Sequence, residues 1–397
     1  MKIDMNILIL TIYYPDNLSY SISQTKAIHY LAKHLVPNNR IVVMHNRIAN
    51  TSFIRMIKHE NEPERFLDEY EVIEGVEVIR NTVENIIPKY CTLNPINVRK
   101  ETEKTLKILT NINFLPDIVV AHFCWQQRQI IRELRKNISV PIIPIFHNID
   151  VKHRQYCMDM SRKYPFAGAR SLRIQNELIQ CGYIANNLFI VNSGYPPFDQ
   201  TDVETKEIKG KEKNKTFVFA GNLIKIKRVD DVIRAMGLLK DKYEFIFKVI
   251  GDGVEKENLI TLANEVGLSD RIIFFGRLSR EETMKQMKRS DCFVMTSSPE
   301  TLGISYIEAM ASKCFIIGSK GEGIDGVIIN EKNGLLAVPR NVDSIKESLE
   351  KYLSMDTSNL VEIINEGYQT SKKFSEKAVS NDYLESLSLM LKKCNNH

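Results

Sequence analysis

Short apolar segments alternate with longer amphipathic segments along this chain, and the alternation restarts after residue 215. This pattern favours parallel βαβ units with helices on both faces of a sheet. Near-continuous apolar runs, such as residues 7–12, are typical of strands buried on both faces. In the first half we expect strands at 6–13, 41–45, 76–80, 117–122 and 141–146, and helices at 21–35, 98–109 and 127–136.

Residues 199–215 are polar and charged, and we interpret them as a linker. Beyond it, the sequence predicts a second set of alternating elements and a mostly helical tail from residue 341. Two Rossmann-like α/β domains facing each other across a cleft are therefore expected, with ligands at the carboxyl ends of the strands. Residues 46–75 show little periodicity and are predicted to be a variable insertion. The second set comprises strands at 216–220, 244–250, 271–275, 291–295 and 314–318, and helices at 229–239, 256–266, 279–288 and 303–312.

The composition narrows the class of protein. The chain has 397 residues, of which 43% are hydrophobic and 26% charged, which is typical of a globular protein and excludes a largely disordered one. No apolar run approaches the roughly 20 residues that a membrane span needs. The seven cysteines form no C-x-x-C pair, so neither a zinc site nor a disulfide framework is expected. The first apolar run is predicted to be a strand rather than a signal peptide, and the expected location is the cytoplasm.

The net charge of +5 arises in the first 200 residues, partly in segments 126–137 and 152–173. We interpret these segments as solvated helix faces. The alternative is a surface that rests on an anionic membrane at its cytoplasmic face. Nucleic-acid binding is not expected, because aromatic residues are not interleaved with a dense basic stripe.

A loop and helix start at residues 297–308 form the strongest local signal. A predicted strand ends, Glu300 follows in a Ser/Pro loop, and a helix that contains Glu308 opens near Gly303. Free N–H groups at a helix start favour an anion or a hydroxyl-rich ligand, and carboxylates accept hydrogen bonds from sugar hydroxyls. The alternative is that Glu300 is a cap and Glu308 a solvated residue. The N–H groups expected in the cleft are those of Thr301, Leu302 and Gly303.

Residues 219–230 form a second signal. A strand runs into Gly221, and Lys225, Lys227 and Arg228 follow before the next helix. Basic side chains beside a glycine turn suit a diphosphate, although surface lysines in a loop are the simpler interpretation. Two further glycine turns are weak signals alone. They are Gly251-Asp252-Gly253 and Gly276-Arg277.

In the first half, His122 ends one predicted strand and His147 follows another, just before Asp150. Both histidines are expected to face the cleft, and the alternative is a structural hydrogen-bonding role. No Ser-His-Asp elbow, Walker loop or zinc-ligand spacing is present, and the first predicted strand is not followed by a G-x-G-x-x-G turn.

Taken together, residues 217–338 resemble the retaining glycosyltransferases of family four, which have the GT-B architecture. The resemblance includes FVFAGNLIKIKRVDDVIRA, FKVIGDG, RIIFFGRL, the E-x7-E element Glu300…Glu308 with its EAMA continuation, and NGLLAVP, in that order. The first half matches more loosely, through His122, the His147 loop and residues 191–194.

The resemblance implies a nucleotide-sugar donor, in which UDP is the commonest nucleotide, and a glycan or lipid-linked acceptor. It implies that Glu308 binds the ribose, that Glu300 holds the donor sugar and that Lys227 neutralises the leaving diphosphate. His122 is implied to lie near the reacting sugar, in a front-face reaction without metal or cofactor. The implied donor-binding set also includes Gly221, Asn222, Arg228, Gly251, Gly253, Arg277, Thr301, Leu302 and Gly303, and the acceptor side Ser19, Ser21, His147 and Asp150.

Two departures from the family pattern affect the donor side. Asn222 stands where the family usually has Arg, and Arg228 is the candidate to replace that charge. The loop after the first strand lacks the usual glycine pair, and Ser19 and Ser21 are the polar groups available there.

The architecture also implies a last helix that returns to the first domain, which gives expected boundaries of 1–198, 199–374 and 375–397. A transferase is the leading hypothesis. A non-catalytic nucleotide-sugar-binding partner is the main alternative, and an epimerase of similar architecture is the third.

Overall fold

The computed structural model describes residues 5–15, 26–61, 68–149, 154–201, 203, 206, 208 and 214–395. It divides the chain into two compact units. Unit 1 comprises Met1–Arg170, Ile174–Gly194 and Val379–His397, and unit 2 comprises Ser171–Arg173 and Tyr195–Ala378. The predicted boundaries at 198 and 374 thus lie close to those at 194 and 378.

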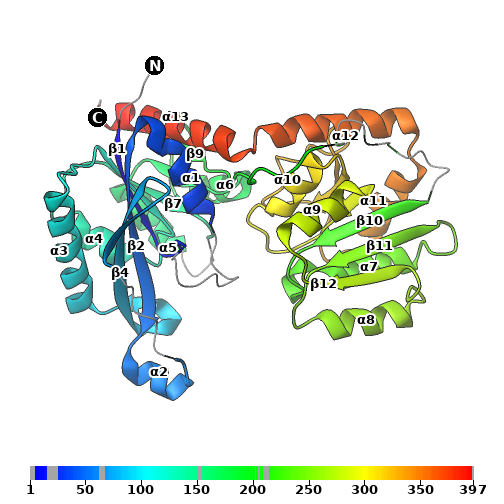
Figure 1. Ribbon diagram of the computed structural model, residues 1–397, viewed down its shortest axis with the longest axis horizontal. Coiled ribbons are helices and arrows are strands. Elements are labelled where there is room, and N and C mark those ends of the chain that lie inside the picture. The colour runs from blue at the N-terminus through cyan, green and yellow to red at the C-terminus, as the bar shows by residue number, and fades with distance from the viewer. Residues whose placement is uncertain are drawn as a thin grey trace. The chain divides into compact units, whose positions relative to one another are not determined.

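Unit 1 is built on a mostly parallel sheet in the order β3-β4-β2-β1-β6-β7-β8-β9, with β5 beside β4 (Figure 1). The first strand pairs with β2 on one side and β6 on the other, so the strand order reverses there. The sheet forms because β1, β6 and β7 are almost wholly apolar and are covered on both faces. The strands are β1 (Asn6–Thr11), β2 (Arg40–Asn50), β3 (Tyr70–Ile73), β4 (Val76–Ile87), β5 (Thr92–Leu93), β6 (Ile118–His122), β7 (Ile142–Phe146), β8 (Ala167–Ala169) and β9 (Leu188–Ile190).

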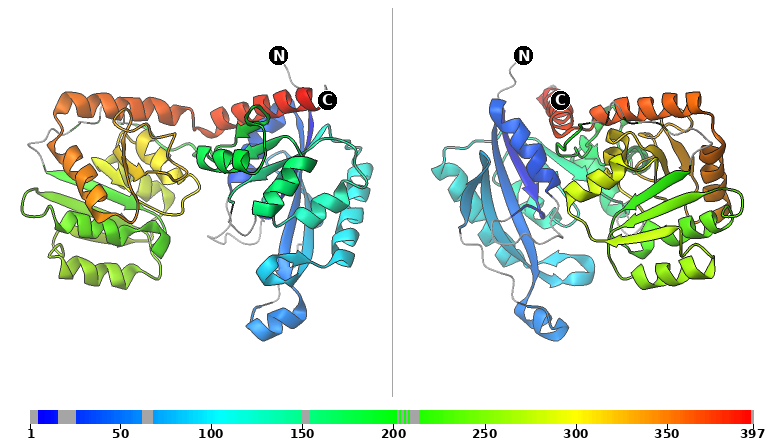
Figure 2. Two further views of the ribbon diagram at one scale, coloured as in Figure 1. Left: turned by 180° about the vertical axis from the view of Figure 1, so that it is seen from behind. Right: turned by 45° about the vertical axis from the view of Figure 1, so that its right-hand side comes forward.

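Helices cover both faces of this sheet, as right-handed crossovers in opposite directions require. Helix α1 lies on one face, and α3 and α4 pack together on the other (Figures 1 and 2). The helices described in unit 1, before the returning tail, are α1 (Ala27–Leu35), α2 (Ser52–Lys58), α3 (Pro95–Asn111), α4 (Arg128–Leu134), α5 (Arg154–Lys163) and α6 (Leu172–Gln180).

The prediction of an unpatterned insertion over residues 46–75 is wrong for most of the part that is described. Strand β2 continues to Asn50 and pairs with β4 along its length, and α2 and β3 follow. Asn46, one of the polar residues that hid this strand, is buried and satisfied: it donates to the Gln127 side chain at 2.7 Å and accepts from Asn81 at 3.0 Å. Helix α2 has no buried residue.

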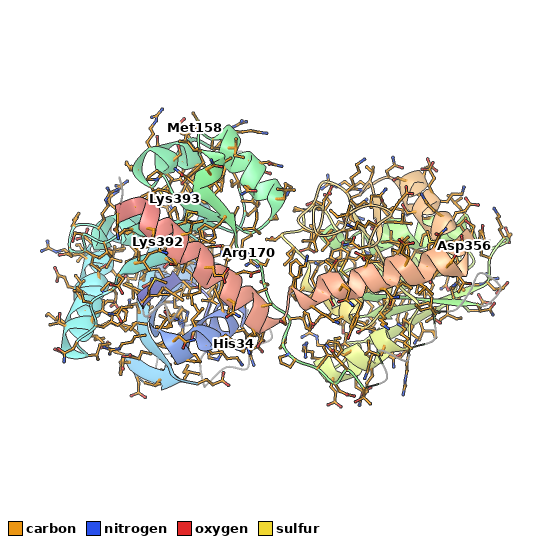
Figure 3. All side chains as sticks on the ribbon, turned by 90° about the horizontal axis from the view of Figure 1, so that it is seen from above. His34, Met158, Arg170, Asp356, Lys392 and Lys393 are labelled. Atoms are coloured by element: carbon orange, nitrogen blue, oxygen red, sulfur yellow. The ribbon has the colours of Figure 1, made fainter. Side chains whose placement is uncertain are left out.

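The last helix, α13 (Glu376–Asn395), belongs with unit 1 from Val379 onward, as predicted. Its buried positions Val379, Tyr383, Leu387 and Met390 recur at helical spacing and form one face. Ser380 donates to the carbonyl of Leu31 on α1 at 3.3 Å. Figure 3 shows α13 running across unit 1, with Lys392 and Lys393 near its C-terminal end.

Unit 2 is a parallel sheet in the order β12-β11-β10-β13-β14-β15, so the strand order reverses between β10 and β13. Such a reversal point is where ligands bind in open α/β sheets. The sequence predicted the strands of this unit except the last, which is short. They are β10 (Lys215–Ala220), β11 (Phe245–Ile250), β12 (Ile272–Gly276), β13 (Cys292–Val294), β14 (Phe315–Ser319) and β15 (Leu335–Ala337).

Helices α7 and α8 lie on one face of this sheet, and α9, α10 and α12 lie on the other (Figure 1). The predicted class of two Rossmann-like α/β domains is confirmed. Within the described part of the chain, no helix combines the length and apolar character needed to span a membrane. The helices are α7 (Val229–Gly237), α8 (Lys256–Glu265), α9 (Arg280–Lys288), α10 (Ile304–Ala311), α11 (Val342–Ser354) and α12 (Thr357–Lys372).

Candidate functional site

The loops after β10 and β13 meet in unit 2, because these two strands are neighbours in the sheet. The ammonium of Lys227 lies 2.6 Å from Oε2 of Glu300. The two side chains are 18% and 12% exposed, so the pair is largely shielded but retains access to solvent. The backbone N–H of Ser298 also donates to the carbonyl of Ile226 at 2.8 Å, which ties the loops together. Two residues that the sequence proposed for catalysis thus form one site.

The Glu300 carboxylate is fixed by several further contacts. Its Oε2 accepts from the Ser297 hydroxyl at 3.0 Å, and its Oε1 accepts from the backbone N–H of Thr301 at 3.1 Å. The backbone N–H of Glu300 donates to the carboxylate of Glu322 at 2.9 Å. Sequence reasoning did not single out Glu322, because it lies outside the E-x7-E spacing. The loop is therefore held at a defined position beside Lys227.

Glycines permit the close packing of this loop against its neighbours. Gly303, with φ of 74°, precedes α10, and a Cβ there would lie 2.7 Å from the ring of Tyr306. A Cβ on Gly323 would lie 1.6 Å from the carbonyl oxygen of Thr301. Thr301 and Gly303 are half-buried and Leu302 is buried, so only the first and last of the three predicted N–H positions lie near the surface.

The turn Gly251–Gly253 packs directly against the loop after β10. Leu223 donates its backbone N–H to the carbonyl of Asp252 at 2.9 Å. A Cβ on Gly251 would lie 1.9 Å from the carbonyl oxygen of Gly221, and Gly251 and Gly253 have φ of 138° and 156°. The turn that was a weak signal in the sequence thus supports the loop that carries Lys227.

The other basic and polar groups of the predicted donor site are arranged differently. Asn222 is exposed at the end of β10. Arg228 makes two hydrogen bonds to Asp231, at 2.8 and 2.9 Å, at the start of α7. Its charge is therefore already paired. Gly276 ends β12 with φ of 68°, and Arg277 beyond it is exposed.

Glu308 lies on α10 with its side chain 11% exposed, and it is not the solvated residue of the alternative interpretation. Burial raises its pKa, and the guanidinium of Arg280 opposes that rise. Arg280 contacts Oε1 through Nε at 3.1 Å and Nη2 at 3.0 Å. The same guanidinium donates to the carbonyls of Pro196 and Pro197 at 2.8 and 3.3 Å. Sequence reasoning missed Arg280, which looks like an ordinary surface residue at a helix start.

In unit 1, the predicted histidines His122 and His147 lie together. Nδ1 of His122 is 3.1 Å from Nε2 of His147, and its Nε2 is 3.0 Å from the hydroxyl of Tyr383 on α13. His122 is 0% exposed, and burial is the main cause that lowers its pKa to about 3. Its burial and two occupied nitrogens do not fit direct contact with a sugar. His147 is half-buried, stacks on Phe123 and is the member of the pair that reaches the surface.

The remaining acceptor-side predictions are Ser19, Ser21 and Asp150. All three lie outside the residues that the structure describes.

Comparisons with known proteins show which proteins the chain is similar to. Residues 201–370 match the model of the family described as glycosyl transferases group 1. Two uncharacterized glycosyltransferases of Methanocaldococcus jannaschii are similar: MJ1069 is 35% identical over 167 residues, and MJ1178 is 28% identical over 273 residues. The alignments cover 41% and 66% of this chain, and 42% and 73% of those proteins. A third relative from that organism, MJ1607, is covered over 38% of its length, so the chain spans less than half of several relatives it matches.

Solved structures share the fold over nearly the whole chain. A glycosyltransferase from Rickettsia africae superposes with a TM-score of 0.71 at 16% identity, covering 98% of this chain and 99% of that one. HepE from Anabaena, in complex with UDP and glucose, gives 0.64 at 16% identity, covering 97% and 99%. Residues 201–370 are therefore similar to the glycosyl transferases group 1 family, and the fold of the chain is that of GT-B glycosyltransferases.

Proposed function

We propose that this protein transfers a sugar from a UDP-sugar to a glycan or lipid-linked acceptor and retains the anomeric configuration. The observation that carries this proposal is the Lys227–Glu300 pair at the reversal point of the unit 2 sheet, 2.6 Å apart and beside the start of α10. A cation and helix N–H groups at such a point suit a diphosphate, and the carboxylate suits sugar hydroxyls.

What similar proteins bind supports uridine diphosphate as the nucleotide of the donor. HepE of Anabaena was solved with UDP and glucose, and with UDP-glucose. A protein from Escherichia coli, described as trehalose-6-phosphate, was solved with UDP-2-fluoro glucose bound. Named relatives include a lipopolysaccharide core biosynthesis glycosyltransferase of Rhizobium meliloti, which supports a glycan or lipid-linked acceptor.

In the proposed reaction, the bond between the anomeric carbon and the β-phosphate oxygen breaks, and a bond from the acceptor oxygen forms on the same face. The departing phosphate oxygen takes the proton of the acceptor hydroxyl. Negative charge grows on the diphosphate as it leaves, and Lys227 is placed to stabilise it. Glu300 orients the donor sugar, so positioning and charge stabilisation provide the catalysis. No metal is part of this scheme.

The proposal is tested by measuring nucleoside diphosphate release from a panel of UDP-, GDP- and ADP-sugars with mixed acceptors, with and without EDTA. Lys227→Gln should lower kcat by roughly 100- to 1,000-fold, as loss of one charge-stabilising donor does. Lys225→Gln is the matched control, because Lys225 lies two residues away, is 64% exposed and pairs with Asp230 instead. Equal turnover in the Lys227 variant and the control would overturn the proposed site, and an inverted product anomer would overturn retention.

One observation favours the second candidate, a nucleotide-sugar-binding protein without transfer. Arg228, which was to replace the charge missing at Asn222, is already paired with Asp231. Binding of a UDP-sugar without diphosphate release, across all acceptors, would select this candidate. Release that depends on Lys227 would exclude it.

We also propose that unit 1 associates with anionic membrane through the C-terminal ends of α4 and α5. These ends adjoin, because Arg135 stacks over Tyr164 at 5.1 Å. Sedimentation with phosphatidylglycerol vesicles, but not with phosphatidylcholine vesicles, tests this, and binding that is equal for both would contradict it. The exposed basic residues there are Arg132, Arg135, Lys136, Arg162 and Lys163.

A further inference from the structure

Successive parallel strands of unit 1 bring polar side chains to one edge of the sheet. The strands β6, β7, β8 and β9 are neighbours in that order. His122 ends β6, His147 follows β7, Arg170 follows β8, and Ser193 lies shortly after β9. Because the carboxyl ends of parallel strands meet at one edge, these residues share the edge where α/β sheets bind ligands.

Arg170 is 7% exposed and is held by neutral groups. Its Nη1 donates to the carbonyl of Val191 at 2.6 Å, and its Nη2 donates to the hydroxyl of Ser193. Its Nε has no hydrogen-bond partner among the residues that the structure describes. The titratable group that acts on it is the Tyr383 phenol, which is neutral because burial raises its pKa, and no carboxylate does so within the described part of the chain.

This arginine carries its charge at neutral pH. Burial lowers its pKa to about 10, which still leaves it protonated. A buried cation without a counter-charge is unfavourable, since desolvation is not offset by an ion pair. An anion bound at Arg170 would remove this cost and would satisfy the free Nε–H or share the Nη2–H.

The groups around Arg170 suit an anion rather than a cation. The pKa of His122 is lowered to about 3 and that of His147 lies well below its ordinary value, mainly through burial and with Arg170 contributing. Both rings are therefore neutral at pH 7 and add no charge, and His147 can donate to a ligand through Nδ1, because its Nε2 is taken by His122. Ser193 adds a hydroxyl donor. The set thus contains one fixed positive charge and several neutral donors.

Access to this set is from the side of His147 and Ser193, which are half-buried, as is Gly194. Figure 3 places Arg170 beside α13, whose Tyr383 closes the other side through its bond to His122. A ligand would therefore meet His147 and Ser193 first and Arg170 behind them.

We propose that Arg170, with Ser193 and His147, binds an anionic group, a phosphate or carboxylate, and that this group belongs to the acceptor. The identity of the ligand as the acceptor rests on the proposed transferase function, whereas the existence of the anion site does not. Within the proposed function, the acceptor would be a phosphorylated or acidic glycan or glycolipid.

The first experiment uses the full chain with ¹³C-labelled histidine side chains and titrates it with inorganic phosphate. Saturating UDP is present throughout, so that the donor site in unit 2 is filled. The His147 and His122 resonances should shift in the wild type, and Arg170→Gln should raise the apparent Kd at least tenfold, as loss of one charge-assisted contact does. Arg99→Gln, which removes an exposed arginine of α3 in the same unit, is the matched control and should behave as wild type.

Two outcomes would overturn the proposal: no shift of either histidine resonance, or an equal shift in the Arg170 variant. If the titration is repeated without UDP, a shift abolished by Lys227→Gln and kept in Arg170→Gln would place the anion in the donor site instead. If Arg170→Gln does not fold, wild-type crystals grown with selenate decide the question by anomalous scattering. A selenium peak within hydrogen-bond distance of Arg170 supports the site, and peaks found elsewhere only, or none, exclude it.

A last measurement tests whether the bound anion belongs to the acceptor. It also distinguishes failure of the anion site from failure of the proposed transferase function. In the transfer assay, a phosphorylated sugar acceptor should lose at least tenfold in kcat/KM with Arg170→Gln, while its unphosphorylated counterpart should not. Equal losses for both acceptors would reject the acceptor as the source. Phosphate binding without any transfer would reject the function and retain the site.

Discussion

Arg280 should control nucleotide affinity through Glu308, although it lies on a different helix. Both of its contacts go to Oε1 of Glu308, at 3.0 and 3.1 Å, which leaves Oε2 for the ribose hydroxyl that the family resemblance implies there. In Arg280→Gln, the buried carboxyl loses the charge that favours its ionised form. It should then take up a proton, because an unpaired buried carboxylate is costly.

The size of the expected loss of UDP affinity follows from the hydrogen bond between Glu308 and the ribose. A hydrogen bond to a charged group contributes about 1.5–3 kcal/mol, whereas a bond to a neutral carboxyl contributes less. Loss of the charge-assisted ribose bond therefore weakens UDP binding by up to roughly 10- to 150-fold. Arg280 is 39% exposed, so solvent screening places the expected loss toward the lower end.

The pH dependence gives the sharper test. Burial already raises the pKa of Glu308 and Arg280 opposes it, so removal of Arg280 raises that pKa further. Ribose binding needs the carboxylate, so affinity falls as pH falls through this pKa. The fall should begin at a higher pH in Arg280→Gln than in wild type.

Calorimetric titration with UDP and with 2′-deoxy-UDP across a pH series checks this. Lys285→Gln on the same helix is the control, since Lys285 pairs with Glu281 and Glu282 instead. Glu308→Gln combined with Arg280→Gln should add little to either single change, because the two residues act as a unit. A wild-type Kd and pH profile in Arg280→Gln, or equal weakening for both nucleotides, would refute the reasoning.

Two stability predictions follow from the backbone and from the buried histidine. Gly251→Ala should lower the free energy of unfolding by roughly 3 kcal/mol or more, since it adds strain and a clash with Gly221, whereas Gly276→Ala, with open space around it, should cost about 1–2 kcal/mol. Chemical denaturation monitored separately in each unit measures both, and equal losses would contradict the clash. Tyr383→Phe should cost about 1 kcal/mol in unit 1, because His122 loses a buried hydrogen bond, and an unchanged denaturation midpoint would show that the bond contributes nothing.

The elements that the sequence predicted well are those whose apolar pattern is undiluted. The strands around β1, β6 and β10 are nearly continuous apolar runs, and their burial on both faces leaves no other assignment. By contrast, β2 carries polar residues in its second half, and the buried Asn46 is satisfied only through contacts distant in sequence. Strands of three residues, such as β8 and β15, are too short to show a period.

The residues of the candidate site also divide into those that the sequence predicted and those that it missed. Lys227 and Glu300 were found because each follows a predictable strand, and the parallel sheet then places such strand ends at one edge. The partners Arg280 and Glu322 were missed, because their roles depend on contacts made across 28 and 22 residues. Arg170 was missed because its signal is that no described carboxylate lies beside it, which only the folded chain reveals.

The return of α13 to unit 1 also sets an order of events during synthesis. Every described residue of unit 2 is made before Val379, so the second unit has its full sequence while the first still lacks a helix. Until α13 arrives, His122 has no phenol beside it, and the surface that Leu387 and Met390 cover stays open to water. Domains generally fold as they emerge, N-terminal first. In this protein the first domain to be translated is the last to be completed. The helix that completes it, α13, also closes one side of its histidine pair.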